Sequence, residues 1–353
     1  MRIWQVVSSL GSGGAEVFAA DLAMALASRG HQVGMAVLSR AAEMGDRSGQ
    51  EARNLARLEA AGIEIAFIGH RARRRVLPAA LALRRVLARA RPEIVHSHLK
   101  IGLLLLSAWR GPVVATHHTT PLHRPRWLMR LLSRRVRAYI GISEQAVVNL
   151  RTIAACPVHL IRNGIDFSRL ELPEVAAHDG VRVLSLGNLR LAKNYPHLVE
   201  IAAQTDPVLT FQIAGEGDQR AAIEAKIATT GTSRVTLLGA RSDVGALLAG
   251  ADIYLLTSHW EGMPIALLES LHAGLPVIAS DVGGVPEILG RDGACAILVA
   301  PEDTEGFVAS LNALAADPER RAAMGAAARD RALTFSIETS AAAHEALYRE
   351  ALA

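Results

Sequence analysis

Short apolar runs alternate with amphipathic stretches along the whole of this 353-residue chain. The runs are rich in Val and Ile and are apolar at consecutive positions, which indicates strands that are covered on both faces. This pattern predicts parallel sheets with helices on either side. Strands are predicted at 3–8, 32–38, 63–68, 94–97, 113–116 and 138–142, and then at 181–186, 209–214, 235–238, 253–257, 276–279 and 295–299. Helices are predicted at 15–29, 51–60, 78–91, 126–135, 219–229, 244–249, 264–273, 304–315 and 337–352.

The alternation breaks between 167 and 180, where no periodicity remains. A chain of this length is large enough for two domains, each with its own core. We therefore predict two doubly wound α/β domains around a cleft. The first covers 1–168, a linker covers 169–180, the second covers 181–335, and a C-terminal helix at 336–353 packs back on the first domain.

Composition excludes several classes of protein. Half of the residues are hydrophobic and charges of both signs are mixed, which excludes intrinsic disorder. Two distant cysteines, Cys156 and Cys295, exclude a disulfide scaffold and are typical of a reducing compartment. No apolar run reaches the roughly 18–20 residues that cross a bilayer, and the N-terminus begins with a strand pattern rather than a signal segment. We expect a soluble cytoplasmic protein.

The charges are segregated between the halves. Residues 1–170 hold 25 Lys and Arg against 10 Asp and Glu, whereas residues 171–353 hold 13 against 24. Such asymmetry suggests that the first half meets an anionic surface. An anionic membrane is favoured because basic residues flank an apolar stripe with Trp127, and the protein would then be peripheral on the inner face of the cytoplasmic membrane. A solvated arginine face is the alternative, and the 4% aromatic content argues against nucleic acid. The basic residues are Arg71, Arg73, Arg74, Arg75, Arg84, Arg85, Arg89, Arg124, Arg126, Arg130, Arg134, Arg135 and Arg137.

A glycine-rich turn, Gly-Ser-Gly-Gly-Ala-Glu at 11–16, follows the first predicted strand and opens a helix. Glycine lets backbone N–H groups approach a ligand, and a helix N-terminus favours an anion. The third glycine of a dinucleotide fingerprint is missing, since Glu16 stands in its place. The turn thus indicates either an anion site or a tight strand-to-helix connection.

The block at 252–269 carries the most information. Its strand ends near Thr257, and Pro264 is predicted as the first helical residue. Glu261 therefore lies at the carboxyl edge of a parallel sheet, where open α/β folds bind ligands, and Glu269 lies further along the helix. A carboxylate beside the amides of Gly262 and Met263 suits a polyol that carries a phosphate, although Glu269 alone could be a solvated helix position.

Two further strand-end loops point to phosphate. Gly283 and Gly284 precede a helix entry and form a second anion nest. Arg190 and Lys193 follow the first strand of the acidic second half, and two cations there suit a diphosphate. Simple solvation of either cation is the alternative.

Four histidines end neighbouring strands of the first half: His96, His98, His117 and His118. They lack helical i, i+4 spacing, a cysteine and an acidic partner, so a metal site is not favoured. We expect these imidazoles to hydrogen-bond a sugar, the backbone or the substrate.

The block in which seven residues separate Glu261 from Glu269, followed by Gly-Gly-Val-Pro-Glu, resembles the retaining family 4 glycosyltransferases (glycosyl transferases group 1) of the GT-B fold. Supporting motifs are Gly-Gly-Ala-Glu at 13–16, Ile-Arg-Asn-Gly-Ile-Asp at 161–166 and Ala-Gly-Glu-Gly at 214–217. The resemblance implies two Rossmann-like domains, with the acceptor at the first and the nucleotide sugar at the second. It implies transfer of a hexose-type sugar from a nucleoside-diphosphate donor to a hydroxyl of a saccharide or lipid-linked acceptor, in cell-surface polysaccharide or glycolipid synthesis.

The resemblance also implies roles for single residues. Glu261 would lie against the donor sugar, His118 would bind that sugar near the anomeric carbon, and Lys193 with a nearby arginine would neutralise the diphosphate. The family arginine directly follows a glycine where this chain has Asn188, so Arg190 is its candidate replacement. Glu269 would hold the ribose hydroxyls. The full donor-binding set is Gly13, Gly14, Glu216, Gly262, Met263, Pro264, Glu269, Gly283 and Gly284.

Breaking a sugar–phosphate bond places negative charge on the leaving diphosphate, which cations and helix N-termini stabilise without a metal. We expect no metal and no cofactor, and no carboxylate pair at glycosidase spacing is evident. Two alternatives stay open. One is a nucleotide-sugar epimerase of the same architecture, and the other is a non-catalytic homologue that binds the donor.

Overall fold

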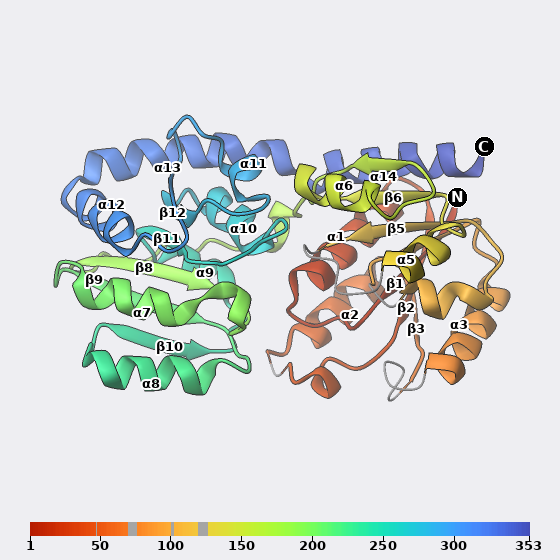
Figure 1. The fold of residues 1–353 in the computed structure, drawn as a ribbon, viewed down its shortest axis with the longest axis horizontal. Coiled ribbons are helices and arrows are strands. Elements are labelled where there is room, and N and C mark those ends of the chain that lie inside the picture. The colour runs from red at the N-terminus through yellow and green to blue at the C-terminus, as the bar shows by residue number, and fades with distance from the viewer. Residues whose placement is uncertain (47, 70–75, 100–101, 119–125) are drawn as a thin grey trace. The chain divides into compact units, whose positions relative to one another are not determined.

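The computed structural model describes residues 1–46, 48–69, 76–99, 102–118 and 126–353. The chain divides into two compact units (Figure 1). Unit 1 comprises Met1–Ile165 and Ile337–Ala353, and unit 2 comprises Asp166–Ser336. The stretch predicted as a linker, 169–180, belongs to unit 2, where a Cβ at Gly245 of a helix would lie 1.9 Å from the Glu171 carbonyl oxygen.

Among its described residues, unit 1 holds a parallel sheet of seven strands in the order β3-β2-β1-β4-β5-β6-β7. The order reverses between β1 and β4, which is where an open α/β sheet opens a crevice at its carboxyl edge. The strands are β1 Arg2–Val7, β2 Gln32–Val37, β3 Glu64–Phe67, β4 Ile94–Ser97, β5 Val113–His117, β6 Ala138–Gly141 and β7 Val158–Leu160. The helices are α1 Gly14–Ser28, α2 Gln50–Ala60, α3 Val76–Ala90, α4 Gly102–Leu105, α5 Arg126–Ser133, α6 Glu144–Arg151 and α14 Ile337–Leu352.

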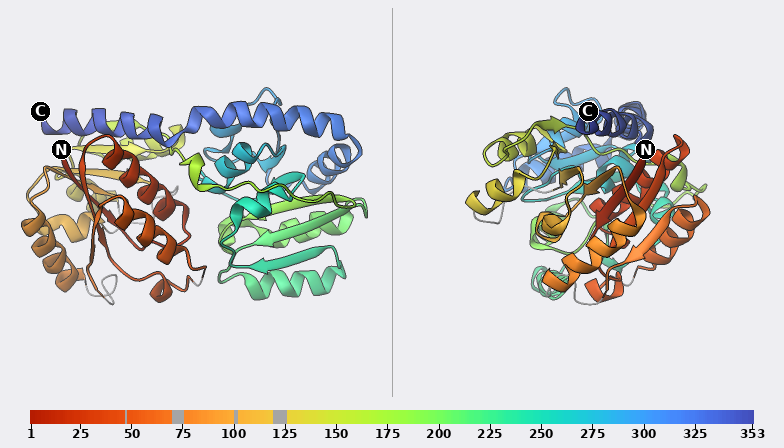
Figure 2. Two further views of the ribbon diagram at one scale, coloured as in Figure 1. Left: turned by 180° about the vertical axis from the view of Figure 1, so that it is seen from behind. Right: turned by 90° about the vertical axis from the view of Figure 1, so that its right-hand side faces the viewer.

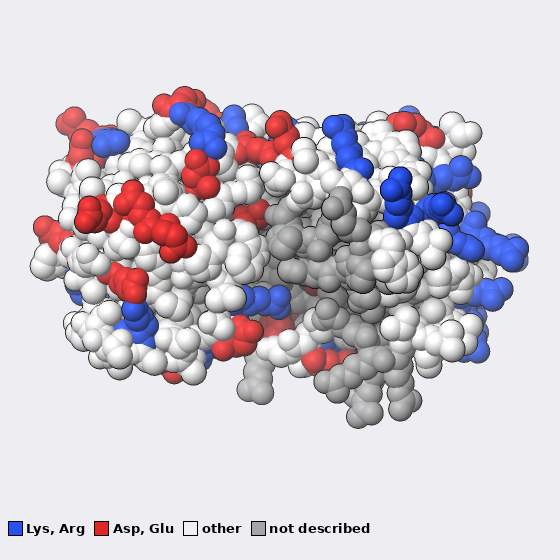
Figure 3. Space-filling model, viewed as in Figure 1, with Lys and Arg blue, Asp and Glu red and all other residues white. Residues whose placement is uncertain are grey.

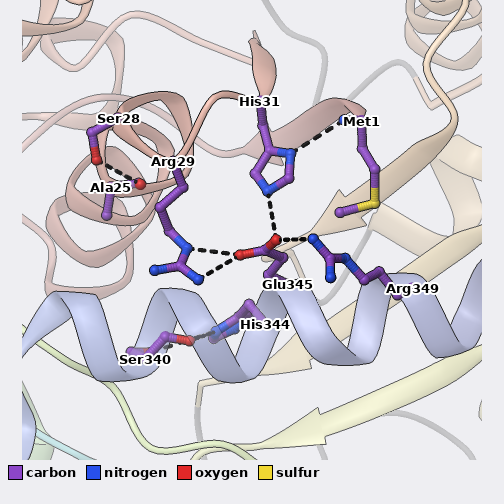
Figure 4. Close-up of polar contacts among 9 residues, drawn as sticks. All are labelled: Met1, Ala25, Ser28, Arg29, His31, Ser340, His344, Glu345 and Arg349. Carbon is purple, nitrogen blue, oxygen red and sulfur yellow. Dashed lines mark hydrogen bonds and ion pairs between the residues drawn. The ribbon is translucent and has the colours of Figure 1, made fainter.

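The C-terminal helix α14 returns to unit 1 and lies beside α1 (Figure 2). Helix α1 is apolar on nearly every side, as expected for a helix that is covered by both a sheet and a second helix. A carboxylate fastens α14 (Figure 4): Glu345 accepts a hydrogen bond from Arg29 at 2.7 Å and pairs with His31 at 3.4 Å and with Arg349. The hydrogen bond from Arg29 lowers the pKa of the Glu345 carboxyl.

Unit 2 is described throughout, and its six parallel strands follow the order β10-β9-β8-β11-β12-β13. The reversal lies between β8 and β11, so the loops after these two strands flank the crevice of this sheet. The strands are β8 Val181–Leu186, β9 Leu209–Ala214, β10 Val235–Gly239, β11 Ile253–Leu256, β12 Val277–Ser280 and β13 Ala296–Val299. The helices are α7 Tyr195–Gln204, α8 Arg220–Thr230, α9 Val244–Ala249, α10 Ile265–Ala273, α11 Val285–Leu289, α12 Thr304–Ala316 and α13 Pro318–Ala332.

The prediction for Pro264 was wrong. Pro264 has an extended backbone (φ −68°, ψ 122°) and caps α10, which begins at Ile265. Proline is compatible with this position because it carries no N–H and its φ is already near −65°. Several elements were not predicted, among them β7, α4, α6, α7 and α13.

Charge follows the two units. Figure 3 shows Lys and Arg side chains gathered over unit 1, and Asp and Glu side chains more frequent over unit 2. On α5 and the turn after it, Arg130, Arg134, Arg135 and Arg137 are exposed. Arg71, Arg73, Arg74, Arg75 and Arg124 lie outside the described residues. No helix in the described part of the chain combines the length and apolarity needed to cross a membrane.

Candidate active site

The loop after β11 carries Glu261 at the carboxyl edge of the unit 2 sheet, as predicted. Lys193 Nζ donates a hydrogen bond to Glu261 Oε1 at 2.7 Å, and Ser258 Oγ donates to the same oxygen at 2.7 Å. Both side chains of the pair are largely buried, with 16% of Lys193 and 12% of Glu261 exposed. Charge-assisted hydrogen bonds of this kind hold both partners in one geometry. Lys193 keeps further N–H groups with which it can bind an anion.

Hydrogen bonds to backbone carbonyls join the Lys193 loop to the strand end and loop that carry Glu261. Thr257 Oγ1 donates to the carbonyls of Lys193 and Asn194 at 3.2 and 3.3 Å, and His259 N donates to Ala192 O at 2.8 Å. Asn194 adopts a left-handed conformation with φ 50°, which ends the turn and starts α7. Lys193 is therefore positioned by the loop that carries its partner.

Glycines bring neighbouring strand-end loops into direct contact. A Cβ at Gly215 would lie 1.9 Å from the Gly187 carbonyl oxygen, and one at Gly283 would lie 2.0 Å from the Glu261 carbonyl oxygen. Gly283 also has a positive φ of 53°, which favours glycine. Gly284 follows as the cap of the short helix α11. Gly283 thus has a packing role beside Glu261 that the sequence did not indicate.

Glu269 lies on α10 and is buried, with its carboxylate hydrogen-bonded by Arg169. Arg169 follows the boundary between the units by only a few residues. Its neighbour Phe167 stacks on His272 of the same helix, with ring centroids 4.4 Å apart. Sequence reasoning missed Arg169 because it assigned the residue to a linker. The available signal was a cation just after the Asn-Gly-Ile-Asp motif.

Other predicted donor residues of unit 2 are less closely joined to this cluster. Arg190 is exposed, and its guanidinium has no ion pair or hydrogen bond with a described residue. Glu216 pairs instead with Arg220 at 3.6 Å. Met263 is buried, while Gly262 is partly exposed in the same loop as Glu261.

In unit 1, the predicted glycines stand at the start of α1. Gly13 is the N-cap residue and Gly14 is the first helical residue. A Cβ at Gly13 would lie 2.2 Å from a Glu16 carboxylate oxygen, and Glu16 also accepts a hydrogen bond from Ser8. The acid that breaks the dinucleotide fingerprint is therefore held against the helix start.

His118 follows β5 and lies within a cluster of buried aromatic rings. Its Nε2 lies 3.0 Å from His98 Nδ1, the two rings stack with centroids 5.3 Å apart, and Phe18 packs edge-on at 5.8 Å. Burial lowers the pKa of His118 to about 3, so the ring is neutral near physiological pH. Buried His344 and Tyr348 of α14 join this cluster through His96, whose Nδ1 lies 2.6 Å from the Tyr348 hydroxyl. Sequence reasoning did not connect the returning helix with the histidines.

The buried histidines contact other groups of the protein. Among the described residues, no group of three or more His, Cys, Asp or Glu side chains could hold a metal ion. His96 instead contacts Thr116 Oγ1 at 2.7 Å, and His344 Nδ1 donates to the Ser340 carbonyl at 2.7 Å.

Two doubly wound parallel-sheet units, with the last helix returning to the first, define the GT-B architecture. The chain matches two family descriptions: Glycosyltransferase Family 4 over residues 12–169 and Glycosyl transferases group 1 over residues 171–331. Together these matches cover most of its length, and the chain belongs to the family 4 glycosyltransferases.

Relatives and solved structures agree with this assignment. The chain is 27% identical over 303 residues to the MMP alpha-(1->4)-mannosyltransferase of Mycolicibacterium hassiacum, covering 76% of this chain and 74% of the relative. It is 28% identical over 285 residues to a glycogen synthase of Mycobacterium tuberculosis, covering 73% and 69%. Its fold matches Anabaena HepE in complex with UDP and glucose, with TM-score 0.83 and 19% identity over 99% of this chain and 100% of that one.

Proposed function

We propose that this glycosyltransferase moves a hexose-type sugar from a nucleoside-diphosphate donor to a hydroxyl of a saccharide or lipid-linked acceptor, with retention of configuration and without a metal ion. The observation that carries the proposal is the Lys193–Glu261 pair, held at the carboxyl edge of the unit 2 sheet. The relatives named as a mannosyltransferase and a glycogen synthase support hexose transfer. The fold neighbour in complex with UDP and glucose supports a nucleotide-sugar donor.

The chemistry of the site fits this reaction. When the bond between the anomeric carbon and the phosphate oxygen breaks, the sugar gains positive charge and the diphosphate gains negative charge. Lys193 and Arg190 stabilise the leaving diphosphate, and Glu261 accepts hydrogen bonds from sugar hydroxyls. In a retaining transfer, the acceptor hydroxyl attacks from the face that the diphosphate leaves, and the departing phosphate oxygen takes the acceptor proton.

The first experiment identifies the base and the sugar of the donor. Thermal unfolding is measured with a panel of UDP-, GDP- and ADP-sugars, in wild type and in Glu269→Gln. We expect one nucleotide class to raise the melting temperature, and we expect the variant to lose most of that increase because Glu269 would no longer accept both ribose hydroxyls. Equal shifts in both proteins would contradict the ribose role of Glu269.

Retention and metal independence are tested on the product. Proton NMR of the product gives its anomeric configuration, which we expect to match that of the donor. Activity should persist in excess EDTA. An inverted product would overturn the proposed mechanism, and loss of activity that added divalent metal restores would overturn metal independence.

A donor-only incubation separates the main alternative. A nucleotide-sugar epimerase would convert the donor to a new epimer without any acceptor, whereas a transferase would leave its stereochemistry unchanged. Donor binding with neither reaction would favour a non-catalytic homologue.

We also propose that unit 1 meets an anionic membrane surface, which would place a cytoplasmic enzyme beside a lipid-linked acceptor in polysaccharide or glycolipid synthesis. Helix α5 supports this proposal: Trp127 and Leu131, four residues apart, are 69% and 53% exposed. Exposed Arg130 and Arg134 share the helix and the turn after it. An apolar stripe beside arginines suits the headgroup region of anionic lipid.

Co-sedimentation with vesicles tests the membrane contact. Wild type should co-sediment with vesicles that contain phosphatidylglycerol. With vesicles of pure phosphatidylcholine, it should stay in the supernatant. Leu131→Ala should weaken binding severalfold because it removes apolar area that would enter the lipid. Leu333→Ala is the matched control, since Leu333 of unit 2 is 67% exposed. Equal binding to both kinds of vesicle would contradict the proposal.

A further inference from the structure

Three side chains of unit 1 form a continuous polar contact that ends on His118. Gln5 comes from β1, His98 follows β4, and His118 follows β5. Gln5 and His98 are buried, and His98 Nδ1 lies 3.0 Å from His118 Nε2. Because one nitrogen of that contact must donate and the other must accept, the proton position on one ring determines the proton position on the other.

The orientation of the Gln5 amide is set by the backbone of α1. Its oxygen accepts from Ala23 N at 3.2 Å, and its nitrogen donates to Ala19 O at 3.1 Å and to His98 Nε2 at 3.0 Å. The opposite orientation would place the amide nitrogen against the Ala23 N–H and the amide oxygen against the Ala19 carbonyl. Gln5 is therefore a donor to His98.

The proton positions follow from this donor. His98 Nε2 accepts from Gln5, so a neutral His98 carries its proton on Nδ1 and donates it to His118 Nε2. A neutral His118 then carries its own proton on Nδ1. Both rings are neutral because burial lowers the pKa of each histidine.

The Nδ1 atom of His118 is shielded from solvent and has no hydrogen-bond partner among the described residues. A buried N–H without an acceptor costs free energy, which an acceptor oxygen relieves. We propose that Gln5 and His98 are positioning residues that keep the His118 proton on Nδ1, so that His118 meets a sugar oxygen as a hydrogen-bond donor. This inference rests on the proposed function for the identity of the ligand, and on the contacts of unit 1 for the proton position.

Nitrogen-15 NMR tests the proton position directly. Two-bond proton–nitrogen correlations distinguish the protonated ring nitrogen from the bare one, and His118→Gln identifies the His118 signals. In the wild-type protein near neutral pH, we expect both His98 and His118 to carry their protons on Nδ1. A wild-type His118 with its proton on Nε2 would overturn the inference.

Paired substitutions test whether Gln5 and His98 determine the proton position of His118. His98→Asn keeps an amide nitrogen near the place of Nδ1 and should preserve the Nδ1–H form of His118, whereas His98→Leu should lower its population. Gln5→Met should act like His98→Leu, because it removes the donor to His98. Thr116→Val is the control: it removes the 2.7 Å contact to His96 in the same buried cluster and should leave the His118 proton in place. If the His118 proton stayed on Nδ1 in both His98→Leu and Gln5→Met, the positioning role of these two residues would be overturned.

Calorimetric binding of the donor, and of the same nucleoside diphosphate without its sugar, tests the consequence. His98→Leu should weaken donor binding about tenfold, the value of one hydrogen bond, and leave nucleoside diphosphate binding unchanged. His98→Asn should recover most of the donor affinity. Equal weakening of both ligands would indicate general damage and overturn the positioning role. If the His118 proton moved but donor binding did not change, the placement of His118 at the donor sugar would be overturned. The NMR result that Gln5 and His98 determine the proton position would stand.

Discussion

The polar side chains at the two sheet edges differ in charge and in how they are stabilised. At the edge of unit 2, charged groups are paired: Lys193 with Glu261 and Arg169 with Glu269. At the edge of unit 1, buried imidazoles contact each other and stay neutral because burial lowers the pKa of His118 and its neighbours. Charge stabilises a phosphate, whereas neutral donors and acceptors suit a sugar hydroxyl. The edge of unit 2 is therefore suited to a charged ligand group, and the edge of unit 1 to a neutral polar group.

The loops differ in the same way. In unit 2, glycines allow carbonyl groups of adjacent loops to approach closely, as at Gly215 and Gly283. In unit 1, rings fill the edge, and α14 supplies two of them, His344 and Tyr348. Close backbone contacts thus pack the loops of unit 2, whereas packed rings fill the edge of unit 1.

The largest expected effect comes from removing charge at unit 2. Lys193→Ala should lower kcat/KM by about a thousandfold, because the leaving diphosphate loses a preorganised cation worth roughly 3–4 kcal/mol. Initial rates with the identified donor measure this change.

Lys226→Ala is the matched control, because Lys226 forms a pair with Glu200 in the same unit, and this pair is more exposed than Lys193 and Glu261. That variant should keep wild-type rates. If Lys193→Ala also kept them, charge pairing at unit 2 would have no part in the chemistry.

The second effect concerns the glycine contact behind Glu261. Gly283→Ala would place a Cβ 2.0 Å from the Glu261 carbonyl oxygen at a φ of 53°. We expect a loss of roughly 2–3 kcal/mol in the free energy of unfolding, together with a lower rate, as the Glu261 loop shifts.

Gly293→Ala separates the backbone strain of a positive φ from the collision of the added Cβ with Glu261. Gly293 has φ 75° but no atom within 4 Å of its added Cβ, so this variant reports backbone strain alone. Urea unfolding of both variants gives the difference that the collision causes. Equal losses would show that the contact with Glu261 is unimportant.

The strand pattern and the paired glutamates could be predicted from the sequence because both depend on local order along the chain. Short apolar runs mark strands wherever they lie, and the loop position of Glu261 follows from the strand before it. The pairing of Arg169 with Glu269 and of Gln5 with His98 could not be predicted, because the partners are distant in sequence. Helix α13 was missed because its face is rich in Ala and Arg, which gives a weak apolar stripe. Pro264 shows that a start signal for a helix is uncertain by one residue.

The smallest expected effect is the dependence of the free energy of unfolding on pH, which His118 of unit 1 causes. The pKa of His118 is about 3 in the folded protein and about 6.5 when the chain is unfolded, so the unfolded state binds one more proton between these values. Stability should therefore fall as the pH falls through this window. From pH 7 to pH 5, His118 alone should contribute a loss of about 2 kcal/mol. His118→Gln should reduce the loss by that amount in urea unfolding at the two pH values. The same loss in both proteins would mean that His118 is charged in the folded state, and the contrast between a neutral edge and a charged edge would fail.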